Sequence, residues 1–160
     1  MSSAERVRSL RSRGQHEVAL RLALELAPQE PSNAELQYEV ACVHDYLGRE
    51  AAAVPFYLAA IAAGLSGEQL RGAYLGLGST YRALGQYQEA LATFDEGLRK
   101  FPNATELKVF KSMALYNVGC NKDAIAGLLA VVVQTSSDQT IQSYRRAITL
   151  YAEDLDRQWQ

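Results

Sequence analysis

The stretch RGAYLGLGSTYRALGQYQEALATFDEGLRKFPNA, residues 71–104, decides the fold of this chain. It consists of two amphipathic segments that meet at Gly85, and Ala90 follows that glycine by five residues. Glycine readily takes the left-handed backbone conformation that ends a helix. The stretch therefore predicts a helix, a tight turn and a second, antiparallel helix, with Ala90 where the two helices cross closely.

The same glycine–alanine spacing occurs four times, at Gly14 and Ala19, Gly48 and Ala53, Gly85 and Ala90, and Gly119 and Ala124. From position 14 to 48, 48 to 85 and 85 to 119, the glycines lie 34, 37 and 34 residues apart. Self-similarity at this period is typical of a helical hairpin that repeats and stacks on its neighbours. We therefore predict one domain, residues 1–160, with four copies of the hairpin over about residues 1–33, 34–70, 71–104 and 105–138.

The third copy resembles a known repeat. Its pattern is Tyr74-x-x-Leu77-Gly78-x-x-Tyr81, then Ala90-x-x-x-Phe94, then Pro102. This is similar to the tetratricopeptide repeat, with Tyr74 in place of the usual tryptophan, and Gly78 as the small residue that permits close helix packing. The resemblance implies an all-α fold: a right-handed α-α superhelix, or solenoid, of four helical hairpins. Copies one, two and four depart from the pattern, with His44 in a tyrosine slot and Lys108 and Lys111 at usually apolar points.

Local signals place the helix ends. Capping boxes or close variants are predicted at Ser2 with Glu5, Ser32 with Glu35, Ser66 with Gln69, and Asn103 with Glu106. The three extra residues of copy two fall within residues 64–70, so the first helix of copy three should start near Gly67, about one turn early. The segment GLLAVVV, residues 127–133, is predicted to be core of the last second helix.

After copy four, residues 139–157 have no partner helix in the repeat pattern. Their apolar residues recur at helical spacing, at Ile141, Tyr144, Ile148, Tyr151 and Leu155. We predict a single C-terminal capping helix over about 139–157, with Tyr151 closing the far end of the solenoid.

The composition excludes several classes of protein. Hydrophobic residues make up 48% and charged residues 21%, and the formal net charge is −2, so nothing attracts the whole chain to nucleic acid or a membrane. Apolar runs such as Leu128 to Val133 are too short to span a bilayer, and no apolar run follows the N-terminal arginines as in a secretory signal. Two distant cysteines, Cys42 and Cys120, fit free thiols in a reducing compartment. We expect a cytoplasmic protein.

Nothing in the sequence predicts catalysis, a cofactor or a metal. Glycines 72, 76 and 78 fall inside a predicted helix with no preceding strand, where a phosphate loop cannot form. His16 and His44 belong to different copies, and no cysteine pair completes a metal set. The N-terminal arginines, at positions 6, 8, 11 and 13, leave two alternatives: a solvated terminal helix, or a basic rim for an acidic peptide or an RNA backbone.

In the resembling family, first helices line a concave groove that holds a peptide. By repeat position, this implies groove residues at Arg8, Arg11, Tyr38, Asp45, Tyr46, Ser79, Arg82, Met113, Tyr116 and Asn117, with Cys42, Leu75 and Val109 beside them. Tyrosine and arginine are enriched among binding hot spots. The alternative, that some tyrosines only pack between neighbouring first helices, stays open, most of all for Tyr38. The lysine–asparagine carboxylate clamp of chaperone-binding members is absent, since its positions hold Ala4 and Arg8, then Tyr38 and Cys42.

The sequence therefore predicts a non-catalytic interaction module that binds a peptide or partner protein in its groove. The alternative is a self-associating structural scaffold, a homo-oligomer in which the groove or the capping helix is occupied by another copy.

Overall fold

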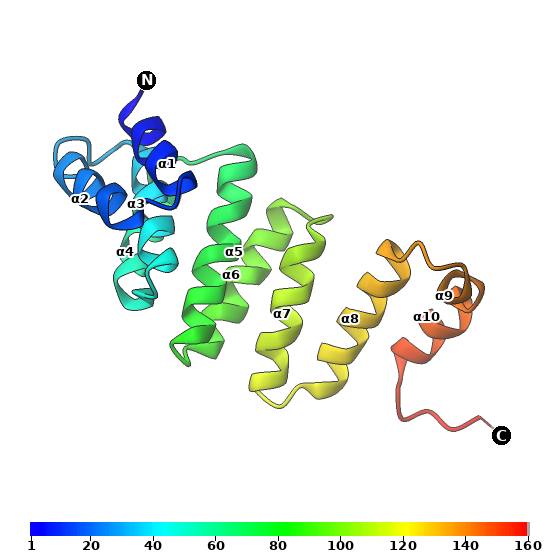
Figure 1. Ribbon diagram of the computed structural model, residues 1–160. Coiled ribbons are helices and arrows are strands. Elements are labelled where there is room, and N and C mark those ends of the chain that lie inside the picture. Colours follow the sequence, from blue (N-terminus) through cyan, green and yellow to red (C-terminus); the bar gives the residue numbers. More distant parts are fainter. Residues whose placement is uncertain (160) are drawn as a thin grey trace.

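The structure, a computed structural model, describes residues 1–159 and contains ten helices and no strand in that range. The helices are α1 (Ser3–Ser12), α2 (His16–Leu26), α3 (Ala34–Tyr46), α4 (Glu50–Ala62), α5 (Gly67–Ala83), α6 (Tyr87–Lys100), α7 (Thr105–Asn117), α8 (Asn121–Thr135), α9 (Gln139–Ser143) and α10 (Arg145–Glu153). Figure 1 shows α1 to α8 as successive hairpins stacked side by side, with the two termini at opposite ends of the molecule. The all-α solenoid predicted from the repeat pattern is confirmed.

Four glycines make the hairpin turns. The φ angles of Gly14, Gly48, Gly85 and Gly119 are 75°, 66°, 76° and 82°, in the left-handed region that side chains with a Cβ avoid. The alanine five residues after each of them is buried. The predicted phasing of the four hairpins is thus present in the backbone.

The tightest packing lies in copy three. Phe94 on α6 is 0% exposed, and a Cβ added to Gly78 on α5 would come within 2.3 Å of its ring. Gly97 on α6 faces Tyr74 on α5 in the same way, with 2.9 Å to the Tyr74 Cβ. Since interiors are close-packed, no side chain fits at Gly78 unless the two helices move apart. The prediction that Gly78 permits close helix packing is confirmed.

Two of the four predicted capping boxes differ by one residue. Ser2 and Glu5 form the predicted box at α1. At α3 the N-cap is Asn33 rather than Ser32, because the Asn33 side chain accepts a hydrogen bond from the Leu36 backbone N–H. Because Asn33 is the N-cap, Ser32 lies outside the helix, in the preceding loop.

The starts of α5 and α7 use no side-chain cap. Ser66 is the N-cap of α5 but makes no capping hydrogen bond, and α5 begins at Gly67, as predicted from the three-residue insertion. At α7 the N-cap is Ala104 rather than Asn103. Ala104 is 2% exposed and belongs to the core around Phe94, so packing rather than capping decides where α7 begins.

The predicted single capping helix over 139–157 is wrong. The segment forms two short helices, α9 and α10, that meet at Tyr144, and the second ends at Glu153. The Gln142 side chain donates to the backbone oxygens of Val133 and Ser136, which ties α9 to the end of α8. Neither helix contains a buried residue, and Tyr151 lies 51% exposed beside Trp159.

A buried histidine makes the fold sensitive to acid. His44 on α3 is 6% exposed, its ring stacks on Phe56, and its Nδ1 has no hydrogen-bond partner among residues 1–159. Burial, and secondarily the nearby charge of Arg49, lowers the pKa of His44 below its usual value of 6.5. As the pH falls through 6.5, the unfolded chain therefore takes up this proton before the folded chain does.

We expect the free energy of unfolding to decrease as the pH is lowered below about 6.5, and to decrease less in His44→Phe, which cannot be protonated. Urea denaturation at several pH values measures both proteins, and every other titrating group is common to the two. Equal pH dependence in both proteins would contradict the assignment.

Candidate polypeptide-binding surface

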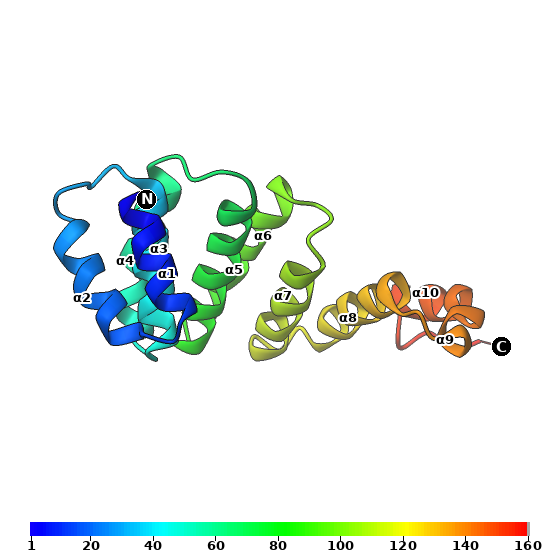
Figure 2. The same ribbon diagram turned by 45° about the horizontal axis from the view of Figure 1, so that its top comes forward.

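The first helices of the four hairpins, α1, α3, α5 and α7, form one continuous surface. Each contacts the next, α1 with α3, α3 with α5 and α5 with α7, as Figure 2 shows from a second direction. All ten residues predicted from repeat position lie on these helices. We call this surface the first-helix face.

At the N-terminal end, two of the predicted arginines are already paired. Glu39 on α3 is 1% exposed, and it accepts hydrogen bonds from Arg8 Nε at 2.7 Å and Arg11 Nε at 3.0 Å. The hydrogen bond to Glu39 raises the pKa of Arg8. Arg8 and Arg11 are therefore structural partners of a buried carboxylate, a role that the sequence did not predict.

Beside this cluster, an exposed tyrosine is held in a fixed orientation. Tyr46 at the end of α3 is 63% exposed. The His16 ring stacks on it with centroids 4.9 Å apart and planes at 11°, and the Arg11 guanidinium lies 5.5 Å from the ring centroid. His16 was missed by the repeat positions because it lies on α2; the signal was its place two residues after the Gly14 turn.

The middle of the first-helix face contains a closed polar network. Asp45 on α3 accepts a hydrogen bond from the Tyr57 hydroxyl at 2.5 Å on one oxygen and from the Thr80 hydroxyl at 3.0 Å on the other. Burial raises the pKa of Asp45. Both Asp45 oxygens thus join α3 to α4 and α5, and the sequence had predicted neither Tyr57 nor Thr80 as their partners.

Tyr38 and Cys42 also serve packing. Tyr38 is half-buried against Tyr57, and a Cβ at Gly72 of α5 would lie 2.4 Å from the Tyr38 hydroxyl oxygen. Burial raises the pKa of the Cys42 thiol to about 11, so the thiol stays protonated. Ser79, on α5, is half-buried. Of the two alternatives for Tyr38, the structure places it between neighbouring first helices.

The C-terminal end of the face is open and apolar. Arg82 Nε donates to Asn117 Oδ1 at 2.7 Å, while Met113 and Tyr116 are 37% and 66% exposed. They border a cavity of about 450 Å³ lined by Arg82, Ser112, Met113, Tyr116, Asn121, Ala124, Ile125 and Leu128. Four of these residues come from α8, which the repeat positions did not predict.

The prediction that residues 127–133 form core is therefore wrong in part. Val133 is 7% exposed, but Leu128 and Val132 are 39% and 41% exposed. A helical apolar pattern identifies a face that avoids water, and it does not supply the neighbour that covers that face.

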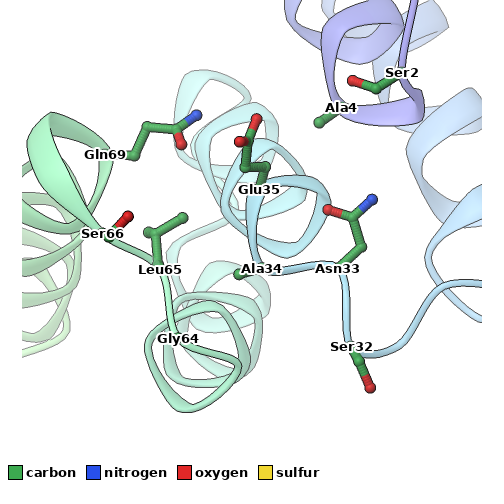
Figure 3. A pocket seen from close by; sticks show the side chains of 10 residues that line it. All are labelled: Ser2, Ala4, Ser32, Asn33, Ala34, Glu35, Gly64, Leu65, Ser66 and Gln69. Atoms are coloured by element: carbon green, nitrogen blue, oxygen red, sulfur yellow. The ribbon is translucent and has the colours of Figure 1, made fainter.

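A second cavity lies at the edge of the stack, where α1, α3 and α5 begin (Figure 3). Its volume is about 400 Å³, and its lining consists of Ser2, Ala4, Ser32, Asn33, Ala34, Glu35, Gly64, Leu65, Ser66 and Gln69. Two of these polar groups already have partners within the fold: Asn33 caps α3, and Glu35 lies 3.4 Å from Arg8. The predicted groove residues lie elsewhere.

Two further features are absent from residues 1–159. No group of three or more histidine, cysteine, aspartate or glutamate side chains there could hold a metal ion. Over the same residues, no helix is long and apolar enough to cross a membrane.

The repeat of this chain matches a known family. A sequence model of the family described as Tetratrico peptide repeat matches residues 33–155. No curated protein matches this chain in sequence. The chain belongs to the tetratricopeptide-repeat family, a class of helical scaffold typical of protein–protein interaction.

Solved structures show the same fold. The crystal structure of YrrB, a TPR protein with an unusual peptide-binding site, is 22% identical with a TM-score of 0.74, and the match covers 98% of this chain and 78% of YrrB. MamA 41-end from Desulfovibrio magneticus RS-1 is 18% identical with a TM-score of 0.73, covering 96% and 88%. The MamA RS-1 ArsTM double mutant is 17% identical with a TM-score of 0.73, covering 96% and 87%. At these identities, the likeness concerns the fold.

Proposed function

We propose that this protein is a non-catalytic, cytoplasmic interaction module that binds a protein or peptide, rather than nucleic acid, along its first-helix face. The observation that carries the proposal is the exposed Tyr46 ring, fixed by His16 and Arg11. A large aromatic side chain that is already oriented loses little conformational freedom on binding, so it suits an anchor point. The family is typical of protein interaction, and YrrB, which shares the fold, has a peptide-binding site.

Of the three arginines predicted on this face, Arg82 is the one that remains for a ligand. Arg8 and Arg11 are opposed by the carboxylate of Glu39, whereas the partner of Arg82 is the neutral amide of Asn117. The Arg82 guanidinium keeps unused N–H donors, which suit a carboxylate. We therefore expect a polypeptide with an apolar or aromatic group near Tyr46 and an acidic group near Arg82 and Tyr116.

Replacing Tyr46 with alanine should lower the affinity for a partner captured from the source cell by about 10- to 30-fold, the range of a hot-spot residue. Isothermal titration calorimetry with the purified partner measures the change. Tyr144→Ala is a matched control, because Tyr144 is also 63% exposed but lies between α9 and α10. Arg82→Ala and Tyr116→Ala should each weaken the same partner. Unchanged affinity in all three face variants would show that the ligand binds elsewhere.

Self-association is a second candidate function, and a specific observation favours it. Large apolar side chains that are at least one-third exposed gather between the start of α7 and residue 159. They are Met113, Tyr116, Ile125, Leu128, Val132, Tyr144, Leu150, Tyr151, Leu155 and Trp159. An extended exposed apolar surface commonly marks a protein interface.

A further inference from the structure

An exposed apolar surface lies on α7 and α8. Ile125, Leu128 and Val132 lie along one side of α8, and they are 48%, 39% and 41% exposed. Met113 and Tyr116 of α7 adjoin them around the apolar cavity. We call these five residues the stacking surface.

The repeat pattern indicates which element would cover this surface. Because copies three and four are 34 residues apart, Ile125, Leu128 and Val132 occupy the positions of Leu91, Phe94 and Leu98 on α6. Those α6 residues belong to the core that includes Leu107 and Phe110 of the next first helix, α7. The stacking surface is therefore the surface that a following first helix would cover.

The C-terminal helices leave it open. α10 packs on a different side of α8, where a cavity is lined by Ala126, Ala130 and Val133 together with residues of α10. Figures 1 and 2 both show α9 and α10 beyond α8, on the far side from α7. The apolar stripe of α8 thus has no covering helix within residues 1–159.

The N-terminal end of a second copy cannot cover the stacking surface. In α5, Gly76 and Leu77 face the preceding hairpin, at Tyr57 and in its core. The corresponding α1 residues, 71 positions earlier, are Glu5 and Arg6, and both are exposed. Head-to-tail stacking would bury these two charged groups against Ile125 and Leu128, which is unfavourable.

We propose that the α8 stripe of the stacking surface, Ile125, Leu128 and Val132, is the interface of a two-fold dimer, in which α8 of one copy packs antiparallel on α8 of a second copy. This inference rests on the self-association proposed above and is independent of ligand binding at Tyr46. A two-fold interface requires one patch that is complementary to itself. The spacing of the stripe meets that need, because an antiparallel pair sets Ile125 opposite Val132 and places Leu128 near the axis.

The charges agree with this orientation. From Ala124 to Thr135, α8 carries no charged residue, and its charges, Lys122 and Asp123, are both in the first turn. In an antiparallel pair the two first turns lie at opposite ends of a 15-residue helix, so like charges stay apart. Lys122 Nζ forms an ion pair with Asp156 of its own chain, so the first turn brings no unpaired cation to the antiparallel pair.

Sedimentation equilibrium of the full chain at rising concentrations tests the dimer. We expect a reversible dimer with a dissociation constant on the order of micromolar, since a patch of so few residues is small beside the about 20–30 residues a side of a standard stable interface. Ile125→Glu should weaken it by at least about 100-fold, because two unpaired carboxylates enter an apolar interface. Leu58→Glu is the matched control: Leu58 is 47% exposed on α4, and its variant should still dimerise.

A second substitution and a disulfide cross-link test the same interface independently. Val132→Glu should repeat the effect of Ile125→Glu, with helix content by circular dichroism and the melting temperature as checks on folding. In a Cys120→Ser background, which removes the exposed native thiol, Leu128→Cys should form an intermolecular disulfide, because the two copies of residue 128 meet near the axis.

Three results would overturn the inference, and each is distinct. A wild-type chain that stays monomeric at all concentrations removes both self-association and this interface, and a helix of another protein is then the occupant. A dimer that survives both glutamate variants keeps self-association and removes this surface. A dimer that is lost in those variants but gives no disulfide at residue 128 removes the antiparallel arrangement. Where the wild-type chain dimerises, Tyr46→Ala should leave the dimer intact.

Discussion

Replacing Phe94 with alanine should lower the free energy of unfolding by about 3–5 kcal/mol. Phe94 is 0% exposed and fills the space between α6 and Gly78 of α5, in the core that also contains Tyr74 and Leu107. Alanine leaves a cavity at this point, and the close contact of two helix backbones prevents the site from collapsing. Since domains are stable by only about 5–15 kcal/mol, the variant loses a large part of its total stability.

Urea denaturation monitored by circular dichroism measures this change. Leu58→Ala on α4 is the control, because Leu58 is 47% exposed and its truncation removes little buried surface; we expect a loss below about 1 kcal/mol. Stacked repeats interact only with their neighbours, so Phe94→Ala should also broaden the transition as the two ends of the solenoid unfold separately. A loss in Phe94→Ala no larger than that in Leu58→Ala would contradict the packing described for copy three.

Replacing Arg8 and Arg11 together by methionine should destabilise the fold by about 3–5 kcal/mol. Glu39 is 1% exposed, and these two guanidinium groups are its hydrogen-bond partners. Without them, a buried carboxylate has no opposing charge in the interface between α1 and α3, and burying an unpaired charge is strongly unfavourable. Thermal and denaturant unfolding at neutral pH measure the loss.

The control for this prediction is the triple variant in which Glu39 is also methionine. Replacing a whole buried ion cluster by apolar side chains of similar size is often neutral or stabilising, so the triple variant should recover most of the stability. If the double and triple variants are equally unstable, the arginines act through packing of their aliphatic parts rather than through Glu39.

The pairing of Arg8 and Arg11 with Glu39 also affects how binding experiments should be interpreted. Arg8 and Arg11 were predicted as groove residues, yet their substitution disturbs the α1–α3 contact whether or not a ligand touches them. Weaker partner capture by such variants would therefore not locate a ligand. Tyr46 and Arg82 are better probes, because Tyr46 is largely exposed and Arg82 is held only by the Asn117 amide on the next helix.

The order and type of the helices were predictable because local backbone chemistry determines them. Gly14, Gly48, Gly85 and Gly119 mark the four turns, since a positive φ is favourable only for glycine. Helical periodicity between these turns gives the amphipathic segments, and the early start of α5 at Gly67 follows from counting residues. Each of these signals lies within a few residues of the feature that it predicts.

The candidate site could be placed on the correct helices but not described from the sequence. Repeat position put Tyr38 and Tyr46 on the same face, and it could not show that Gly72 of another helix packs against Tyr38 while Tyr46 stays exposed. It gave no partner for Arg11 or Asp45, because Glu39 and Thr80 reach them across helix boundaries, 28 and 35 residues away. Such pairs depend on how adjacent hairpins stack.

The sequence by itself therefore determined the repeat, its phase and the apolar side of every helix. Only the tertiary structure decided which apolar sides are covered, because burial depends on a neighbour that can lie far along the chain. The break at Tyr144 and the packing of α10 on α8 leave the stripe of Ile125, Leu128 and Val132 open. At the same positions on α6, Phe94 is buried and Leu91 and Leu98 are partly buried, since α7 follows in register and packs against them.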